Sequence, residues 1–190
     1  MATRLLFHPG STFAAIDYSS GTGASLIFAL IYGSLGQIIG RYWFTLLEIQ
    51  HGTLVADALT NTLHFALWTV ATPVLLLVSL LIGTCTIHCS LAILRGTHRP
   101  LRATLQVLAY TSGATALLNV IPLAGSIIAP LWGFVLAYHG LAACHQTSKL
   151  RAVLALLLPV IFSVLVLLII FMGVAATGLL QIMEKVASSL

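Results

Sequence analysis

Residues 152–180 read AVLALLLPVIFSVLVLLIIFMGVAATGLL, and this stretch decides the class of fold. It contains no ionisable side chain, and it exceeds the roughly 20 apolar residues that a helix needs to cross a bilayer. Backbone polar groups in hydrocarbon must bond within their own segment, so an apolar run of this length is expected to be helical. The stretch therefore predicts a membrane-spanning helix.

The rest of the chain also has the composition of a protein embedded in lipid. Of its 190 residues, 59% are hydrophobic and only 6% are charged, whereas a soluble domain usually carries roughly 25% charged residues. We expect the net charge of +4 to orient the protein and attract lipid headgroups, and not to bind nucleic acid. The sequence predicts an integral membrane protein.

Four further apolar segments precede this one, at about 25–40 (continuing into 42–44), 63–94, 104–120 and 124–144. Between the first two lies the mixed segment 41–61, which contains Glu48 and Asp57 and is expected to be a loop carrying an interfacial helix. We predict an all-α, polytopic bundle of five transmembrane helices. Its parts are a cytoplasmic or interfacial segment 1–24, a transmembrane domain 25–184 and a short tail 185–190.

Basic residues in short loops predict the orientation of the bundle. A cytoplasmic N-terminus places six basic residues inside and leaves only Arg41 and Lys185 outside. The opposite orientation would reverse this ratio of six to two. The basic residues then inside are Arg4, Arg95, Arg99, Arg102, Lys149 and Arg151. We therefore predict a protein of the inner (plasma) membrane with its N-terminus in the cytoplasm and its C-terminus outside.

Small residues recur at helical spacing on two of the segments and allow backbones to approach closely in lipid. The first stripe is Ala29, Gly33, Gly36 and Gly40, and the second is Gly133, Ala137, Gly140 and Cys144. We expect both stripes to pack against other helices of the same chain, and a homodimer face is the alternative.

Two stretches of the chain resemble the Yip1 domain family of five-span membrane proteins. The first is RLLFHPGSTFAAI at 4–16, with Pro9 and Phe13 four residues apart. The second begins at His88, and its family-like features follow in order and at matching spacing. These features are His88, Gly96, LQVLAY at 105–110, IPLAG at 121–125, Trp132, and His145 with Ser148. The resemblance covers most of the chain and is weakest through 41–61.

This resemblance implies a five-helix bundle with a cytosolic N-terminus, as in small bacterial members of the family. Eukaryotic members are linked to vesicle trafficking and Rab-type GTPases through a longer hydrophilic N-terminal region. The present chain has only about two dozen residues there, so that role is not carried over. Bacterial relatives are largely of unknown function, and the resemblance predicts an architecture and no activity.

Cys85, His88 and Cys89 are the strongest candidates for metal ligands, because residues three and four apart share one face of a helix. Thiolate and imidazole groups suit zinc or copper, and His145 or Cys144 is a possible further ligand. The chain has no CxxC pair, and a free cysteine often behaves as a small buried hydrophobe. We favour packing and a helix-end hydrogen bond over a metal site at Cys85, His88, Cys89 and His145.

A haem held by two of His88, His139 and His145 is a further alternative, although no haem-attachment motif is present. The sequence contains no HExxH, no GxSxG and no phosphate-cradling glycine loop. The spans carry no carboxylate of the kind that proton-coupled transport normally uses. We predict no resident cofactor and no catalytic residue.

The favoured function is therefore that of an accessory, scaffolding or membrane-organising component. It would act through contacts with membrane lipids, with another membrane protein or with further copies of itself. The first alternative is a small-solute or metal-ion transporter or channel that uses the Cys and His residues. The second is a haem or redox subunit of a membrane complex.

Overall fold

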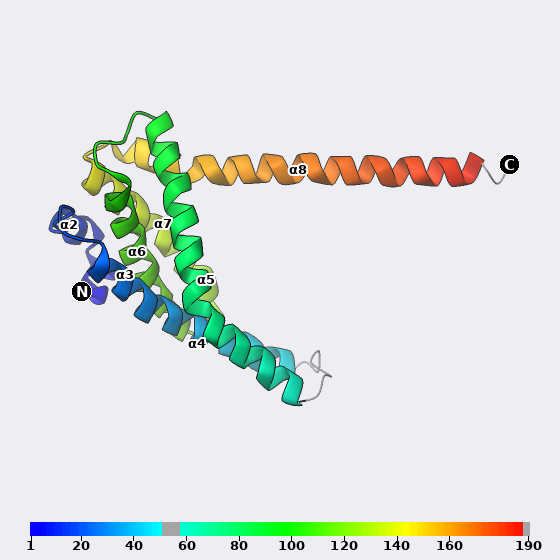
Figure 1. Cartoon of the computed structure of the whole chain (residues 1–190), viewed down its shortest axis with the longest axis horizontal. Coiled ribbons are helices and arrows are strands. Elements are labelled where there is room, and N and C mark those ends of the chain that lie inside the picture. The colour runs from blue at the N-terminus through cyan, green and yellow to red at the C-terminus, as the bar shows by residue number, and fades with distance from the viewer. Residues whose placement is uncertain (51–57, 188–190) are drawn as a thin grey trace.

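The computed structural model describes residues 1–50 and 58–187, with side chains in 1–47, in 62–174 and at 177. Every regular element in these residues is helical, which confirms the predicted all-α class. Figure 1 shows a bundle from which α8 projects. The elements are α1 (Ala2–Phe7), α2 (Pro9–Ala14), α3 (Gly23–Phe28), the π-helix η1 (Ala29–Gly33), α4 (Ser34–Gln50), α5 (Ala58–Ile93), α6 (Leu101–Ala116), the 3-10 helix η2 (Leu117–Val120), α7 (Ala124–His145) and α8 (Lys149–Ala187).

Four helical stretches in the described residues are long and apolar enough to cross a membrane. They are Gly23–Leu47, Thr62–Ile93, Ala124–His145 and Lys149–Val174, and they coincide with the predicted first, second, fourth and fifth spans. The predicted third span corresponds to α6, which has 16 residues, followed by η2. Because α6 alone is shorter than the roughly 20 residues that a crossing needs, the count of five spans stays a prediction.

The mixed segment 41–61, predicted as a loop carrying an interfacial helix, is helical wherever the structure describes it, and its first part continues the first span beyond the predicted 42–44. Helix α4 continues to Gln50, and α5 already begins at Ala58; residues 51–57 lie outside the described part of the chain. No glycine or proline interrupts α4 after Gly40, and the guanidinium carbon of Arg41 lies 5.9 Å from the centre of the Trp68 ring. A charged side chain that packs on a neighbouring helix does not end its own helix.

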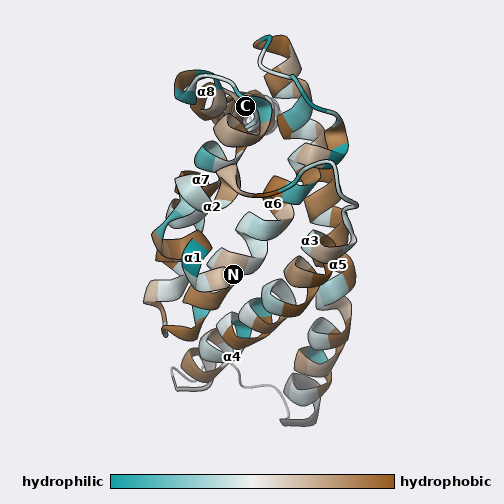
Figure 2. Ribbon diagram, turned by 90° about the vertical axis from the view of Figure 1, so that its left-hand side faces the viewer, coloured by the Kyte–Doolittle hydropathy of each residue, from teal (hydrophilic) through white to brown (hydrophobic). Residues whose placement is uncertain are grey.

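Helix α6 forms the centre of the bundle. In Figure 2 it lies between α2 and α7 on one side and α3 and α5 on the other. Most of its residues are buried, among them the polar residues Thr104, Gln106, Thr111 and Thr115. The core is therefore built around a helix of small and polar side chains, and the more apolar helices surround it.

Both small-residue stripes pack inside the chain, as predicted. A Cβ atom at Gly36 of α4 would collide with the backbone of Ala116 at the end of α6. A Cβ atom at Gly140 of α7 would meet the side chains of Val107 and Phe13. The glycines thus allow α4 and α7 to approach α6 closely.

The N-terminal segment is part of this core. Leu5 of α1 and Phe13 of α2 are completely buried, and the indole N–H of Trp132 on α7 donates to the carbonyl of Leu6 at 3.0 Å. Pro9 begins α2 and so divides the two short helices. Where these helices lie relative to a membrane surface stays a prediction.

Candidate functional site

Three polar side chains meet where α5 ends, α6 begins and α7 ends, at what we call the histidine end of the bundle. His88 lies near the end of α5, Thr104 in the first turn of α6, and His145 is the last residue of α7. Helix α7 stops there because Gln146 adopts a left-handed conformation with φ of 50°, which a continuing helix does not accept.

A continuous chain of hydrogen bonds connects these residues. The backbone N–H groups of His98 and Arg99 each donate to Nδ1 of His145 at 3.3 Å. Nε2 of His145 lies 2.9 Å from Oγ1 of Thr104, and the same oxygen lies 2.8 Å from Nδ1 of His88. The loop between α5 and α6 is thereby tied to all three helices.

For neutral rings, these contacts assign the proton of His145. Nδ1 of His145 accepts two N–H groups, so the ring proton of His145 is assigned to Nε2. Nε2–H then donates to the hydroxyl oxygen of Thr104, and the bond between that hydroxyl and Nδ1 of His88 can form with either group as the donor. The direction of the network is thus set from the loop amides as far as Thr104.

Burial makes this network a rigid structural element. His145 and Thr104 are both completely buried, and a buried polar group without a partner is costly. A charged His145 would carry a proton on Nδ1, which would face two N–H donors. The geometry thus favours the neutral ring and fixes its orientation.

The structure brings together only two of the four predicted metal ligands. The ring centres of His88 and His145 are 5.8 Å apart, whereas Cys85 and Cys89 are exposed on α5. Within the described ranges 1–50 and 58–187, no three His, Cys, Asp or Glu side chains are placed to hold a metal ion. A zinc or copper site at these residues stays the alternative to the packing role that the sequence favours.

The third histidine considered for haem lies elsewhere on α7. The ring of His139 stacks on the ring of Tyr138 with centres 4.2 Å apart, and its Nδ1 faces Gly10 of α2. His145 instead faces α6 through Thr104. The two α7 histidines thus contact different elements.

A second contact joins the histidine end to the N-terminal segment. The guanidinium carbon of Arg99 lies 5.4 Å from the centre of the Tyr18 ring, and the buried hydroxyl of Tyr18 donates to the carbonyl of Phe13 at 2.9 Å. Burial raises the pKa of the Tyr18 phenol. Hydrogen bonds from the hydroxyl and backbone N–H of Ser19 lower the pKa of the neighbouring Asp17 carboxyl.

Sequence reasoning singled out His88 and His145 but missed Thr104, which connects them. Its two partners lie 16 and 41 positions away in the chain, so no local spacing indicates the contact. An unremarkable threonine at the start of an apolar segment gives no other signal.

The model of the Yip1 domain family matches residues 3–171. The matched region includes the histidine end, α6 and the first part of α8. No curated protein and no solved structure shows a match to the chain.

Proposed function

The chain belongs to the Yip1 domain family, and on this premise we propose that it is a non-enzymatic accessory or scaffolding component of a membrane. It acts through contacts with lipids and with other membrane helices. The observation that carries this proposal is the position of α8, most of which lies outside the bundle.

Helix α8 packs on α5 and α7 only through its first turns. Ala152 and Ala155 are completely buried there, and Leu156 nearly so. From Val160 to Val174 the side chains are exposed on every side of the helix, and Figure 1 shows this part extending away from the bundle. A helix that is apolar all round requires lipid or other helices around it.

Contacts of α8 can be captured in the membrane with a photo-crosslinking amino acid in place of Phe171. The matched control carries the same amino acid in place of Phe7, because the two side chains have nearly equal exposure, 72% and 75%, but Phe7 lies on the bundle. We expect a discrete protein adduct, either a second copy or a partner, from position 171 only. Lipid adducts alone from both positions would contradict a helix-mediated role.

We further propose that the protein lies in the plasma membrane with its histidine end facing the cytoplasm. Arg95, Arg99, Arg102, Lys149 and Arg151 all lie at that end of the bundle or next to it, in or beside the turns that connect α5–α6 and α7–α8. The positive-inside tendency supports this orientation. A C-terminal alkaline phosphatase fusion should be active and a C-terminal green fluorescent protein fusion dark; the reverse pattern would overturn the assignment.

A further inference from the structure

We propose that Arg41 and Gln37 form a binding site for a phosphate group, carried by a phospholipid or present as the free ion. The site lies on α4, at the end of the bundle opposite the histidine end. The proposal goes beyond the function proposed above, since α8 takes no part in it.

Arg41 lies inside the first candidate span. It belongs to the apolar stretch Gly23–Leu47, in the C-terminal part of α4. An ionisable side chain within a span is costly and is by default a candidate for function. Near the end of a span, a long side chain such as arginine can extend its charged group to the zone in which lipid headgroups lie.

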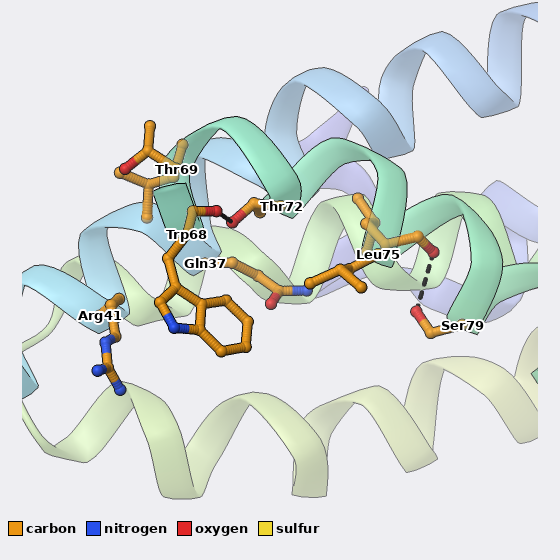
Figure 3. Close-up of a pocket in the computed structure, with 9 residues that line it drawn as sticks. Gln37, Arg41, Trp68, Thr69, Thr72, Leu75 and Ser79 are labelled. Carbon is orange, nitrogen blue, oxygen red and sulfur yellow. Dashed lines mark hydrogen bonds between the residues drawn. The ribbon is translucent and has the colours of Figure 1, made fainter. Parts of the chain in front are cut away.

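Two cavities open on the two sides of Arg41. The first, about 340 Å³, lies between α4 and α5 and is shown in Figure 3; its polar lining comes from Gln37, Arg41, Trp68, Thr69, Thr72 and Ser79. The second, about 460 Å³, lies between α4, α6 and α7 and includes Ser112 and Asn119. Gln37 and Arg41 line both cavities, because residues four apart lie on one face of a helix.

Gln37 and Arg41 supply most of the hydrogen-bond donors that are free in the cavity shown in Figure 3. The hydroxyls of Thr69, Thr72 and Ser79 each donate to a backbone carbonyl of their own helix, at 2.8, 2.7 and 2.9 Å. In the part of the chain that the structure describes, the side chains of Gln37 and Arg41 make no hydrogen bond. An arginine presents five N–H donors and a glutamine two, so the site has a surplus of donors.

The charge of the site is also unopposed within the described residues. Neither cavity is lined by an aspartate or a glutamate. In Figure 3 the guanidinium group lies beside the indole of Trp68, at 5.9 Å from the ring centre, a contact that orients a cation without neutralising it. A surplus of donors with a positive charge selects an anion that accepts several hydrogen bonds.

Phosphate is the anion that fits both the donors and the location. A guanidinium group binds phosphate through two parallel hydrogen bonds, and a phospholipid presents its phosphate in the headgroup zone that the Arg41 side chain can reach. The cavity between α4 and α5 continues from its polar part onto Ile38, Leu75 and Leu76. These apolar side chains provide a surface along which an acyl chain can lie.

The test uses the full chain, purified in a neutral detergent and titrated with phosphatidylglycerol, with binding followed by native mass spectrometry. Arg41→Ala should weaken binding at least 10-fold and Gln37→Ala less. Arg41→Lys should fall between wild type and Arg41→Ala, because lysine keeps the charge but loses the paired geometry. Arg102→Ala, which removes the same charge from an exposed position at the histidine end, should change binding less than two-fold.

Two further ligands identify the chemistry that is bound. Diacylglycerol with the same acyl chains lacks phosphate and should bind at least 10-fold more weakly. Competition by millimolar inorganic phosphate would assign the site to the free ion as well as the lipid; no competition would assign it to the lipid headgroup. Equal losses in Arg41→Ala and Arg102→Ala, or undiminished binding of diacylglycerol, would overturn the proposal, whatever the α8 cross-linking shows.

Discussion

Helices α6 and α8 are opposites in both composition and environment. Helix α6 contains threonine, glycine, alanine and glutamine, and most of its residues are buried. Helix α8 is almost wholly apolar from Ala152 to Val174, yet beyond its first turns its side chains are exposed. In a soluble protein the more apolar helix would be the buried one.

The difference shows what drives packing in this fold. Lipid is as apolar as leucine, so the bilayer gives no reason to bury the side chains of α8. Small residues let helices approach closely, and polar residues bond across helix contacts, so α6 is the helix that others surround. Substitutions on α6 should therefore destabilise the protein much more than the same substitutions on α8.

The largest expected contrast is between two glycines. A Cβ atom at Gly113 of α6 would lie 2.7 Å from the ring of Phe28 and 3.0 Å from its carbonyl oxygen, whereas at Gly173 of α8 nothing lies within 4 Å. Gly113→Val should lower the free energy of unfolding by about 3 kcal/mol, at the upper end for overpacking. Gly173→Val should change it by less than about 0.5 kcal/mol.

Thermal unfolding in a mild detergent, followed by intrinsic fluorescence, measures both variants under the same conditions. A similar loss in the two variants would mean that α8 is packed as tightly as α6, for example against a second copy. An unchanged Gly113→Val protein would contradict the close contact between α6 and α3.

The next contrast concerns a hydroxyl group. Thr104→Val keeps the shape of the side chain but removes the oxygen that joins His88 to His145. Leaving the buried Nε2 of His145 and the partly buried Nδ1 of His88 without this partner should cost about 1–3 kcal/mol. Thr86→Val on α5 is the control, because that exposed hydroxyl bonds only to the backbone of its own helix. Equal effects of the two substitutions would show that the hydrogen-bond chain does not stabilise the fold.

The sequence predicts much of this fold, because long apolar runs leave helices as the main solution in lipid. It placed the end of the first span at about 40–44, whereas α4 continues to Gln50, because the mixed composition after Gly40 does not show that Arg41 lies beside Trp68. It also gave no indication that α8 leaves the bundle. Uniform apolarity marks a residue as compatible with lipid but does not say which neighbour it contacts.

The histidine end was predicted in part. His88 and His145 were identified as candidates, but Thr104 was not, because its contacts depend on how three helices pack. The exposure of Cys85 and Cys89 depends on how α5 is rotated about its axis. A pattern of three- and four-residue spacing places residues on a common face, but it does not specify what that face meets.

A smaller loss of stability is expected at alkaline pH, from Tyr18 at the edge of the core around α6. Burial raises the pKa of Tyr18, so its stabilising contribution is complete below about pH 10, the ordinary pKa of tyrosine. That contribution is lost as the pH rises above this value, by at most about 1.4 kcal/mol per pH unit. Stability measured from pH 8 to 11 should turn downward in wild type, and Tyr18→Phe should lack that part of the decline.

The smallest effects are expected at the exposed thiols of α5. Cys85→Ser and Cys89→Ser should each change the free energy of unfolding by less than about 0.5 kcal/mol, because no packing is lost. Cys144→Ser, at a completely buried position, should cost about 1–3 kcal/mol because it buries a hydroxyl in an apolar site.

Adding metal tests the same exposed thiols in a second way. A metal that binds only the folded state must stabilise it. We expect zinc and a chelator to leave the unfolding midpoint of wild type and of Cys85→Ser the same within error. Stabilisation by zinc that disappears in Cys85→Ser and in His88→Ala would instead establish a metal site. It would also require α5 to rotate, so that its thiols turn from the surface toward His145.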